Sequence, residues 1–186
     1  MNKIGFIIIL LVSACISLEA QDKFYTKTGK IFFECTKSPL EKIEATNKSS
    51  TCVLDIKTGN LQFSVLMKGF EFERALMQEH FNENYVESSK YPKSDFKGLI
   101  TNNNDINYTK DGEYMVRVKG RLQIHGEAKD VEANGKIKIG NGKILTSSTF
   151  EVLLSDYNIR IPSLVSDKVS SKVNIIVDCS LEPFKG

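Results

Sequence analysis

Apolar and polar residues alternate along several stretches of the chain. Between positions 114 and 124, the even positions hold Tyr, Val, Val, Gly, Leu and Ile, whereas the odd positions hold Met, Arg, Lys, Arg and Gln. Positions 61–67 and 173–181 alternate in a similar way. Successive residues of a strand point to opposite faces, so this period of two predicts strands with one apolar and one solvent-facing side. Strands of this kind are typical of antiparallel sheets.

Short turn motifs separate these stretches. They are Thr58-Gly59-Asn60, Asp111-Gly112, Asn134-Gly135 and Asn141-Gly142. Asn-Gly and Asp-Gly tolerate positive φ at both central positions of a hairpin turn. We therefore expect a series of antiparallel strands joined by hairpins. Closure of such a sheet into a barrel is favoured because it removes exposed strand edges.

One segment departs from the period of two. Residues 71–86 are rich in helix-forming residues and repeat large side chains every four positions. The repeats are Phe72, Leu76 and His80 on one stripe, and Met77, Phe81 and Tyr85 on another. This spacing predicts one amphipathic helix, packed over a mouth of the barrel or along its wall. Residues 163–172 are a weaker candidate for a turn of helix or an extended loop.

The first twenty residues have the layout of a secretory signal peptide. A lysine at position 3 precedes the apolar run 6–12, and small and polar residues follow up to Ala20. Cleavage after Ala20 would leave one mature domain, residues 21–186, which is large enough to bury its own core. The stretch 12–15 also resembles a lipobox, which makes a lipoprotein anchored at Cys15 the alternative. Either reading predicts a periplasmic or secreted protein without a stable membrane span.

Composition and motifs exclude several function classes. The net charge is +2 and basic residues are interleaved with acidic ones, so nucleic acid is not an expected partner. The chain has two histidines and no recognisable catalytic or phosphate-binding motif, so we expect neither an enzyme nor a metal site. His80, beside Glu79, and His125, before Gly126, could each be a packing residue or contact a ligand head group.

The mature cysteines are expected in the protein interior. Cys35, Cys52 and Cys179 each share strand parity with apolar neighbours, which places all three thiols on the apolar side of the sheet. They could be three small core residues, or one disulfide with one thiol left over. The spacing does not choose the pair.

Three motifs resemble those of the YceI-like family. The stretch 63–98 resembles the family's helix with a histidine, followed by an acidic loop, Tyr-Pro and a strand; the matching positions are His80, Phe81, Tyr91, Pro92, Phe96 and Gly98. The stretch 120–131 is similar to its Gly-x-Leu-x-Ile-His-Gly element, and 156–162 to its late Asp-aromatic-x-Ile element. The first fifty mature residues and the three cysteines depart from the family pattern.

This resemblance implies an all-β fold, namely an extended, lipocalin-like antiparallel β-barrel of about eight strands with one packed helix. It also implies a secreted or periplasmic, non-enzymatic protein that binds a long isoprenoid or other lipid chain in the barrel interior, with no other cofactor. The side chains then expected at the ligand are Phe63, Val65, Phe72, Leu76, His80, Phe81, Phe96, Tyr114, Val116, Val118, Leu122, Ile124 and His125.

Other functions remain open from the sequence. The phenylalanines could fill the barrel completely, which would give a solid-core structural or interaction protein. A hydrolase or isomerase using the same pocket would need two titratable groups that converge on it, and the sequence offers no obvious pair. The oligomeric state is undetermined, and a homodimer is left open.

Overall fold

The computed structural model describes residues 22–37 and 42–184. The expectations for residues 1–20, including lipid attachment at Cys15, fall outside these ranges. The described chain forms eight strands: β1 Lys23–Thr36, β2 Glu44–Asp55, β3 Asn60–Leu66, β4 Lys93–Ile100, β5 Gly112–Ile124, β6 Glu127–Gly140, β7 Lys143–Leu153 and β8 Val169–Pro183.

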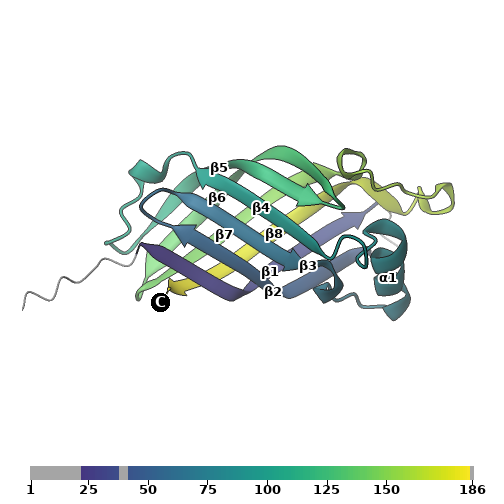
Figure 1. Ribbon diagram of the computed structural model, residues 1–186, viewed down its shortest axis with the longest axis horizontal. Coiled ribbons are helices and arrows are strands. Elements are labelled where there is room, and N and C mark those ends of the chain that lie inside the picture. Colours follow the sequence, from purple (N-terminus) through teal and green to yellow (C-terminus); the bar gives the residue numbers. More distant parts are fainter. Residues whose placement is uncertain (1–21, 38–41, 185–186) are drawn as a thin grey trace, which may run out of the picture.

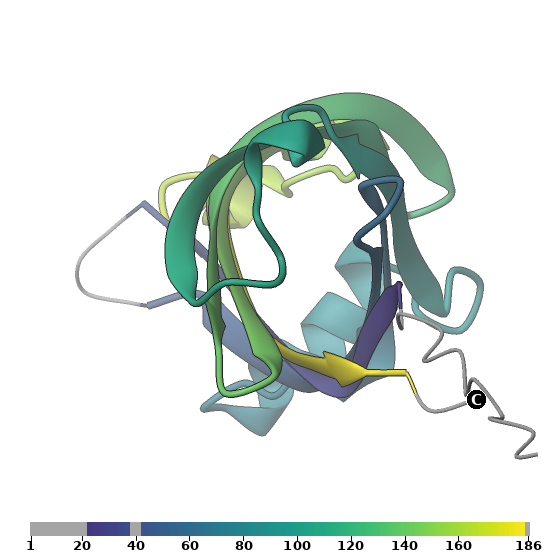
Figure 2. The same ribbon diagram turned by 90° about the vertical axis from the view of Figure 1, so that its left-hand side faces the viewer.

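These strands close into one antiparallel barrel (Figures 1 and 2). Each strand pairs with the next one in the sequence, and β8 returns to pair with β1 along the ladder that includes Phe33↔Ile175. Every described strand thus has two neighbours, so none is an edge strand of the kind that promotes aggregation. The predicted eight-stranded, mainly β fold is confirmed.

The connections between strands divide between the two ends of the barrel (Figure 1). Segments 67–92, 125–126 and 154–168 lie at one end, which we call the mouth end. Segments 56–59, 101–111 and 141–142 lie at the opposite end, the far end. The long connections 67–92 and 154–168 therefore both lie around one opening of the barrel.

The hairpin motifs are partly confirmed. Asn141 and Gly142 form a tight turn with φ values of 52° and 71°, and Gly59 has a φ of 77° in the β2–β3 turn. The expectation for Asn134-Gly135 was wrong. Both residues lie inside β6 because they pair continuously with β5, and the turn lies instead at His125 and Gly126, with φ values of 51° and 80°.

One further sequence expectation was wrong, and another holds only in part. Gly112 begins β5, and the β4–β5 connection is the long segment 101–111 rather than a tight hairpin at Asp111-Gly112. In the weaker candidate 163–172, the expected turn of helix is present as one 3-10 turn, η5, Ser163–Val165, but Val169 onward already belongs to β8. In both cases the end of the strand is set by its pairing with a neighbouring strand. The local turn motif carries no information about that pairing.

The predicted helix exists but is shorter than 71–86. It consists of α1, Ala75–His80, followed directly by one π-helical turn, η2, Phe81–Tyr85. Its beginning is delayed because Glu71 pairs with Thr46 of β2 in an isolated bridge and Arg74 is still extended. Among the described residues, no helix has the length and apolarity needed to span a membrane.

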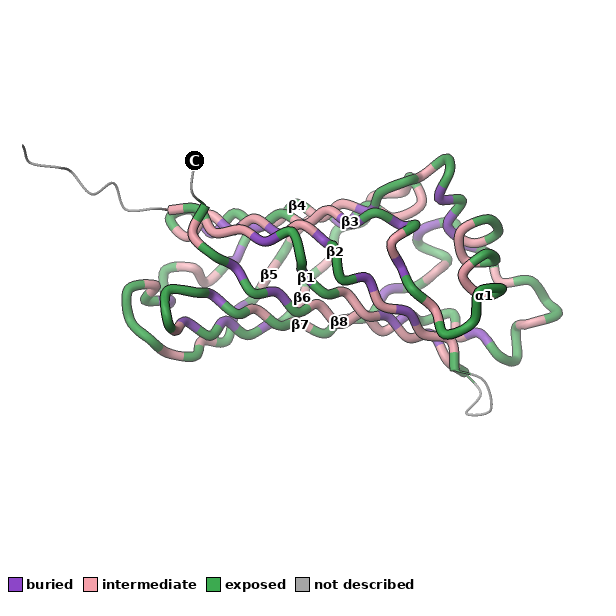
Figure 3. The backbone as a smooth tube through the Cα atoms, turned by 90° about the horizontal axis from the view of Figure 1, so that it is seen from below, coloured by how far each residue is buried: buried purple, intermediate pink, exposed green. Residues whose placement is uncertain are grey.

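Buried and exposed residues alternate along the strands (Figure 3). In β5, Val116 and Leu122 are buried while Arg117, Lys119 and Arg121 are exposed, as the sequence pattern predicts. The inward side chains form two clusters, one near the mouth end and one near the far end. Cys35 belongs to the first cluster and both Cys52 and Cys179 to the second, so the predicted burial of all three is confirmed.

The wall between β6 and β7 is incomplete toward the mouth end. These two strands pair only from Gly135↔Ser148 to Gly140↔Lys143, although β6 begins at Glu127 and β7 continues to Leu153. The 3-10 turn η4, Leu154–Tyr157, packs against β6, β7 and β8. The turn therefore places its side chains at the edge of the barrel interior.

Candidate functional site

The described residues enclose a cavity of about 450 Å³ that runs inside the barrel. Inward side chains from all eight strands line it, together with residues of α1 and η2. Its wall is made mainly of Ile, Val, Leu and Phe side chains. A volume of this size is typical of sites for small molecules and lipid segments. The barrel is therefore hollow, which argues against the solid-core alternative.

The cavity reaches solvent at the mouth end. Arg74, Leu76, His80 and Lys168 border it there, and all four side chains are exposed. At the far end, Ile106 and Tyr108 of the long β4–β5 connection pack against the buried cluster of that end. The arrangement is a tube with a polar and charged rim at the mouth and an apolar closure at the far end.

Four phenylalanines hold the helical segment against the barrel. The ring centroid of Phe33 on β1 lies 5.3 Å from that of Phe70 and 5.5 Å from that of Phe81 on η2. Phe72 lies 5.1 Å from Phe81. Aromatic contacts at these distances are favourable beyond the area they bury. They fix α1 and η2 as a partial cover of the mouth.

The structure brings most of the predicted ligand residues to this cavity. The residues that line it are Phe63, Val65, Phe72, Leu76, His80, Phe81, Phe96, Val116, Val118, Leu122 and Ile124. They come from β3, β4, β5 and the segment 72–81 between β3 and β4, which are consecutive parts of the chain. Their binding to a ligand remains a prediction.

Tyr114 and His125 do not line the cavity, contrary to the sequence expectation. Tyr114 packs against the far-end cluster, and its hydroxyl donates a hydrogen bond to the carbonyl of Asn107 at 3.3 Å. Its position near the start of β5 places it beyond the end of the tube. His125 lies in the turn after β5, where the alternation of the strand no longer directs its side chain inward.

His125 instead joins three segments at the mouth end. Its Nε2 lies 2.7 Å from a carboxylate oxygen of Glu87, and its Nδ1 lies 3.0 Å from the carbonyl oxygen of Tyr157. The ring of Tyr91 packs edge-on against the imidazole, 4.6 Å between centroids. Asn158 donates a hydrogen bond to Glu127 at 2.8 Å beside this network. The side chain of His125 is therefore occupied by structural contacts.

His80 has a different environment. It is exposed on α1, borders the mouth of the cavity, and its Nδ1 lies 3.0 Å from the side-chain amide of Asn84. It is the histidine that a ligand head group at the mouth could contact. Among the described residues, no group of three or more His, Cys, Asp or Glu side chains is arranged to hold a metal ion.

The surroundings of two cysteines disfavour the thiolate, whereas hydrogen bonds to Cys52 and Thr146 hold the pKa of the Cys179 thiol below its ordinary value. Burial and the nearby Glu34 carboxylate raise the pKa of the Cys35 thiol to about 12. A hydrogen bond to Cys179, together with burial, raises the pKa of the Cys52 thiol well above its ordinary value. All three described cysteines are free thiols in this structure. They act here as small core residues, and Cys35 borders the cavity.

Sequence reasoning missed several lining residues. Phe33 follows the same alternation as Ile31 and Cys35, so its position on the inner face of β1 was available from the pattern. Phe70 and Tyr157 were not, because each belongs to a connection without regular periodicity. Tyr157 is 2% exposed and borders the cavity, and its position depends on how η4 docks onto the barrel.

Comparisons with known proteins agree with this geometry. A family model described as YceI-like domain matches residues 23–181. A polyisoprenoid binding domain from Saccharophagus degradans, implicated in plant cell wall breakdown, superposes with a TM-score of 0.75 at 11% identity, covering 89% of this chain and 100% of that one.

BcnA from Burkholderia cenocepacia superposes with a TM-score of 0.66 at 16% identity, covering 82% of this chain and 95% of that one. At such identities the two structures establish a shared fold. A search of curated proteins by sequence finds no match. The family model covers nearly the whole described barrel, and the chain therefore belongs to the YceI-like domain family.

Proposed function

We propose that this protein binds the long apolar chain of an isoprenoid or another lipid inside its barrel, as a carrier, store or sequestering protein. The observation that supports this proposal most directly is the hollow interior, a tube of about 450 Å³ walled by aliphatic and aromatic side chains and open at one end. The similarity to a solved polyisoprenoid binding domain supports the same ligand class.

The physical basis of binding is removal of apolar surface from water. Burial of roughly 300 Å² of a hydrocarbon chain would contribute about 7.5 kcal/mol, at ~25 cal/mol per Å². Loss of translational freedom and ordering of the chain reduce this value. The lining is already formed by strand pairing, so little reorganisation of the protein is required. Such a chain needs no charged anchor to bind.

The proposed location is outside the cytoplasm, in the periplasm or as a secreted protein. This part of the proposal depends on the signal-like residues 1–20, with the lipoprotein anchored at Cys15 as the alternative. N-terminal sequencing of protein from its own host should find Gln21 as the first residue. An acylated Cys15 would support the alternative, and an intact Met1 in a cytosolic fraction would contradict both.

Native mass spectrometry of protein purified gently from its host tests the ligand class. We expect a bound species whose mass, after release into organic solvent, corresponds to a lipid with a long apolar chain. A fluorescent polyprenyl analogue should also bind the delipidated protein and be displaced by unlabelled polyprenol. Failure of both the native ligand search and the displacement assay would contradict the proposed function.

A further inference from the structure

Cys52 on β2 and Cys179 on β8 hold their thiols against each other inside the barrel. The two side chains belong to the far-end cluster and are hydrogen-bonded to one another. Both residues are buried, with 0% and 5% of their surface exposed. They are remote in the sequence, so only closure of the barrel brings them together. Neither residue lines the cavity, so the proposed lipid binding leaves this contact unexplained.

A missing side chain on β1 makes this contact possible. β1 lies between β2 and β8 in the sheet, so its inward side chains would ordinarily separate those of the two flanking strands. At Gly29 that row is interrupted, because a Cβ there would lie 2.7 Å from the Sγ of Cys179 and 2.7 Å from the Oγ of Ser50. Ser50 lies on β2, two residues before Cys52. Side chains from β2 and β8 therefore share the space above Gly29, and the two strands approach each other directly across β1.

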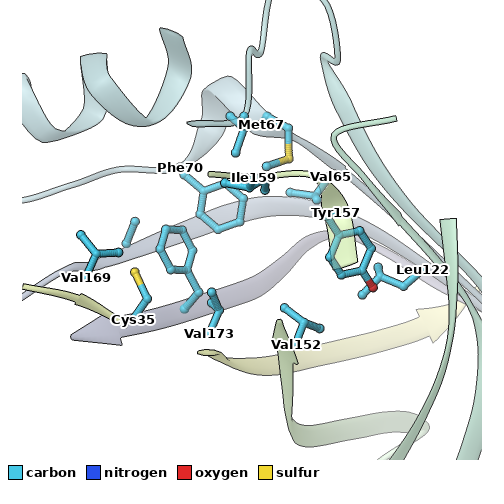
Figure 4. Packing of buried hydrophobic residues seen from close by; sticks show 13 residues of the cluster. Cys35, Val65, Met67, Phe70, Leu122, Val152, Tyr157, Ile159, Val169 and Val173 are labelled. Carbon is cyan, nitrogen blue, oxygen red and sulfur yellow. The ribbon is translucent and has the colours of Figure 1, made fainter. Parts of the chain in front are cut away.

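The third described cysteine has a different location. Cys35 belongs to the mouth-end cluster and borders the cavity, and Figure 4 shows it with Val169 and Val173 of that cluster. Its thiol donates a weak hydrogen bond to the carbonyl of Ile43 at 3.8 Å. The sequence left open which two of the three cysteines could pair. The structure leaves one choice, because Cys35 is separated from the other two by the length of the tube.

Two thiols in contact can be joined by thiol–disulfide exchange. The thiolate of one cysteine attacks a disulfide supplied by another molecule, such as oxidised glutathione, and expels one thiol. The second cysteine then attacks the resulting mixed disulfide, which forms the bond between Cys52 and Cys179 and expels the second thiol. Overall, two protein thiols lose two electrons and two protons, and the external disulfide is reduced to two thiols. Because both sulfurs are buried in the closed barrel, this exchange takes place during folding, before the far end closes.

We propose that Cys52 and Cys179 form a disulfide when the protein folds under oxidising conditions, and that Cys35 remains a free thiol. The bond ties β2 to β8 across β1 and holds the far end of the tube closed. It closes a loop that contains β3 to β7, and a cross-link restricts the unfolded chain more strongly the longer its loop. The inference depends on the barrel fold and not on lipid binding. Oxidising conditions agree with the proposed location outside the cytoplasm.

Refolding of protein purified from its host tests the pairing. Reduced, unfolded protein is diluted into a mixture of reduced and oxidised glutathione, and the folded fraction is alkylated in denaturant, digested and mapped by mass spectrometry. We expect Cys35 to be alkylated, and Cys52 and Cys179 to be recovered as one cross-linked peptide pair that separates on reduction. A cross-link that includes Cys35, or alkylation of all three cysteines, would overturn the inference. This measurement uses the wild type alone and needs no variant that folds.

Thermal unfolding measures the consequence of the bond. Reduction of the refolded wild type should lower its Tm by roughly 4–16 °C, the effect of one disulfide in a chain of this size. Cys52→Ala should show no shift on reduction. Cys35→Ala is the matched control, since it removes a buried thiol from the other cluster and should retain both the cross-link and the shift. A shift in Cys52→Ala equal to that of the wild type, or loss of the cross-link in Cys35→Ala, would contradict the assigned pair.

Discussion

His125 connects three separate parts of the mouth end through one side chain. Both of its ring nitrogens face acceptors, the carboxylate of Glu87 and the carbonyl of Tyr157, and the imidazole is largely buried with 11% of its side chain exposed. Its backbone and those of Glu87 and Asn158 all have positive φ, at 51°, 44° and 54°. Such conformations persist in non-glycine residues where surrounding contacts stabilise them.

We predict that His125→Asn lowers the free energy of unfolding by about 1–3 kcal/mol, because the buried carbonyl of Tyr157 loses its partner. Asparagine tolerates positive φ, so this variant leaves the β5–β6 turn unstrained and isolates the side-chain contacts. Urea denaturation monitored by circular dichroism measures the effect. Unchanged stability would show that the contacts at His125 contribute nothing net to the fold.

Substitution of His80 is expected to change ligand binding slightly, rather than stability. It borders the mouth and is exposed, so His80→Gln should leave stability unchanged and weaken binding of a polyprenol by no more than about tenfold. Displacement titrations measure this change. Catalysis by His80 would instead appear as turnover of a lipid that falls about 10²–10⁴-fold in the variant, and such a result would contradict the carrier proposal.

At the level of the strands, two glycines allow Phe96 to lie against the wall of the tube. Gly98 of β4 and Gly120 of β5 are directly paired, and a Cβ on Gly98 would lie 2.4 Å from the Phe96 ring. A Cβ on Gly120 would lie 2.5 Å from the Cα of Gly98 and 2.6 Å from the same ring. The glycine pair therefore creates the space that the ring occupies, and Phe96 borders the cavity.

We predict that Gly120→Ala destabilises the barrel by about 1–3 kcal/mol, since the clash involves backbone atoms that cannot move aside cheaply. Gly140→Ala on β6 is the control. A Cβ there would meet only Asp111 Oδ2, at 4.0 Å, and we expect a change within about 0.5 kcal/mol. Thermal and urea unfolding compare the two, and equal destabilisation would mean that space at Phe96 is not the cause.

For the molecule as a whole, the side chains of β5 point alternately into the cavity and toward the solvent. Val118 lines the tube, whereas Met115 on the same strand points outward with 66% of its surface exposed. Val118→Arg should weaken binding of a fluorescent polyprenyl analogue by roughly a hundredfold or more, because an unpaired charge in an apolar tube is strongly disfavoured.

Met115→Arg introduces the same side chain on the opposite face of β5 and should bind the analogue like the wild type. Circular dichroism spectra of both variants verify that the barrel has formed. If the two substitutions reduce binding equally, the ligand does not occupy the interior of the barrel, and the proposed binding mode is wrong.

Some features of this protein follow from the sequence alone because they depend on neighbouring residues. Apolar alternation along 61–67, 114–124 and 173–181 requires only that a strand present successive residues to opposite faces, and it correctly predicted the inner faces of β3, β5 and β8. The helical segment and the Asn141-Gly142 turn are local in the same sense. Most of the predicted cavity residues follow from these faces.

Other features were decided by tertiary structure. Asn134-Gly135 favours a turn locally, but pairing with Arg117 and Val116 of β5 keeps both residues in a strand. His125 does not line the cavity, because Glu87 and Tyr157, which are remote in sequence, contact its two ring nitrogens. Tyr157 borders the cavity because η4 packs beside the short β6–β7 ladder. In each case the deciding contacts come from residues far along the chain, and these contacts form only when the barrel has closed.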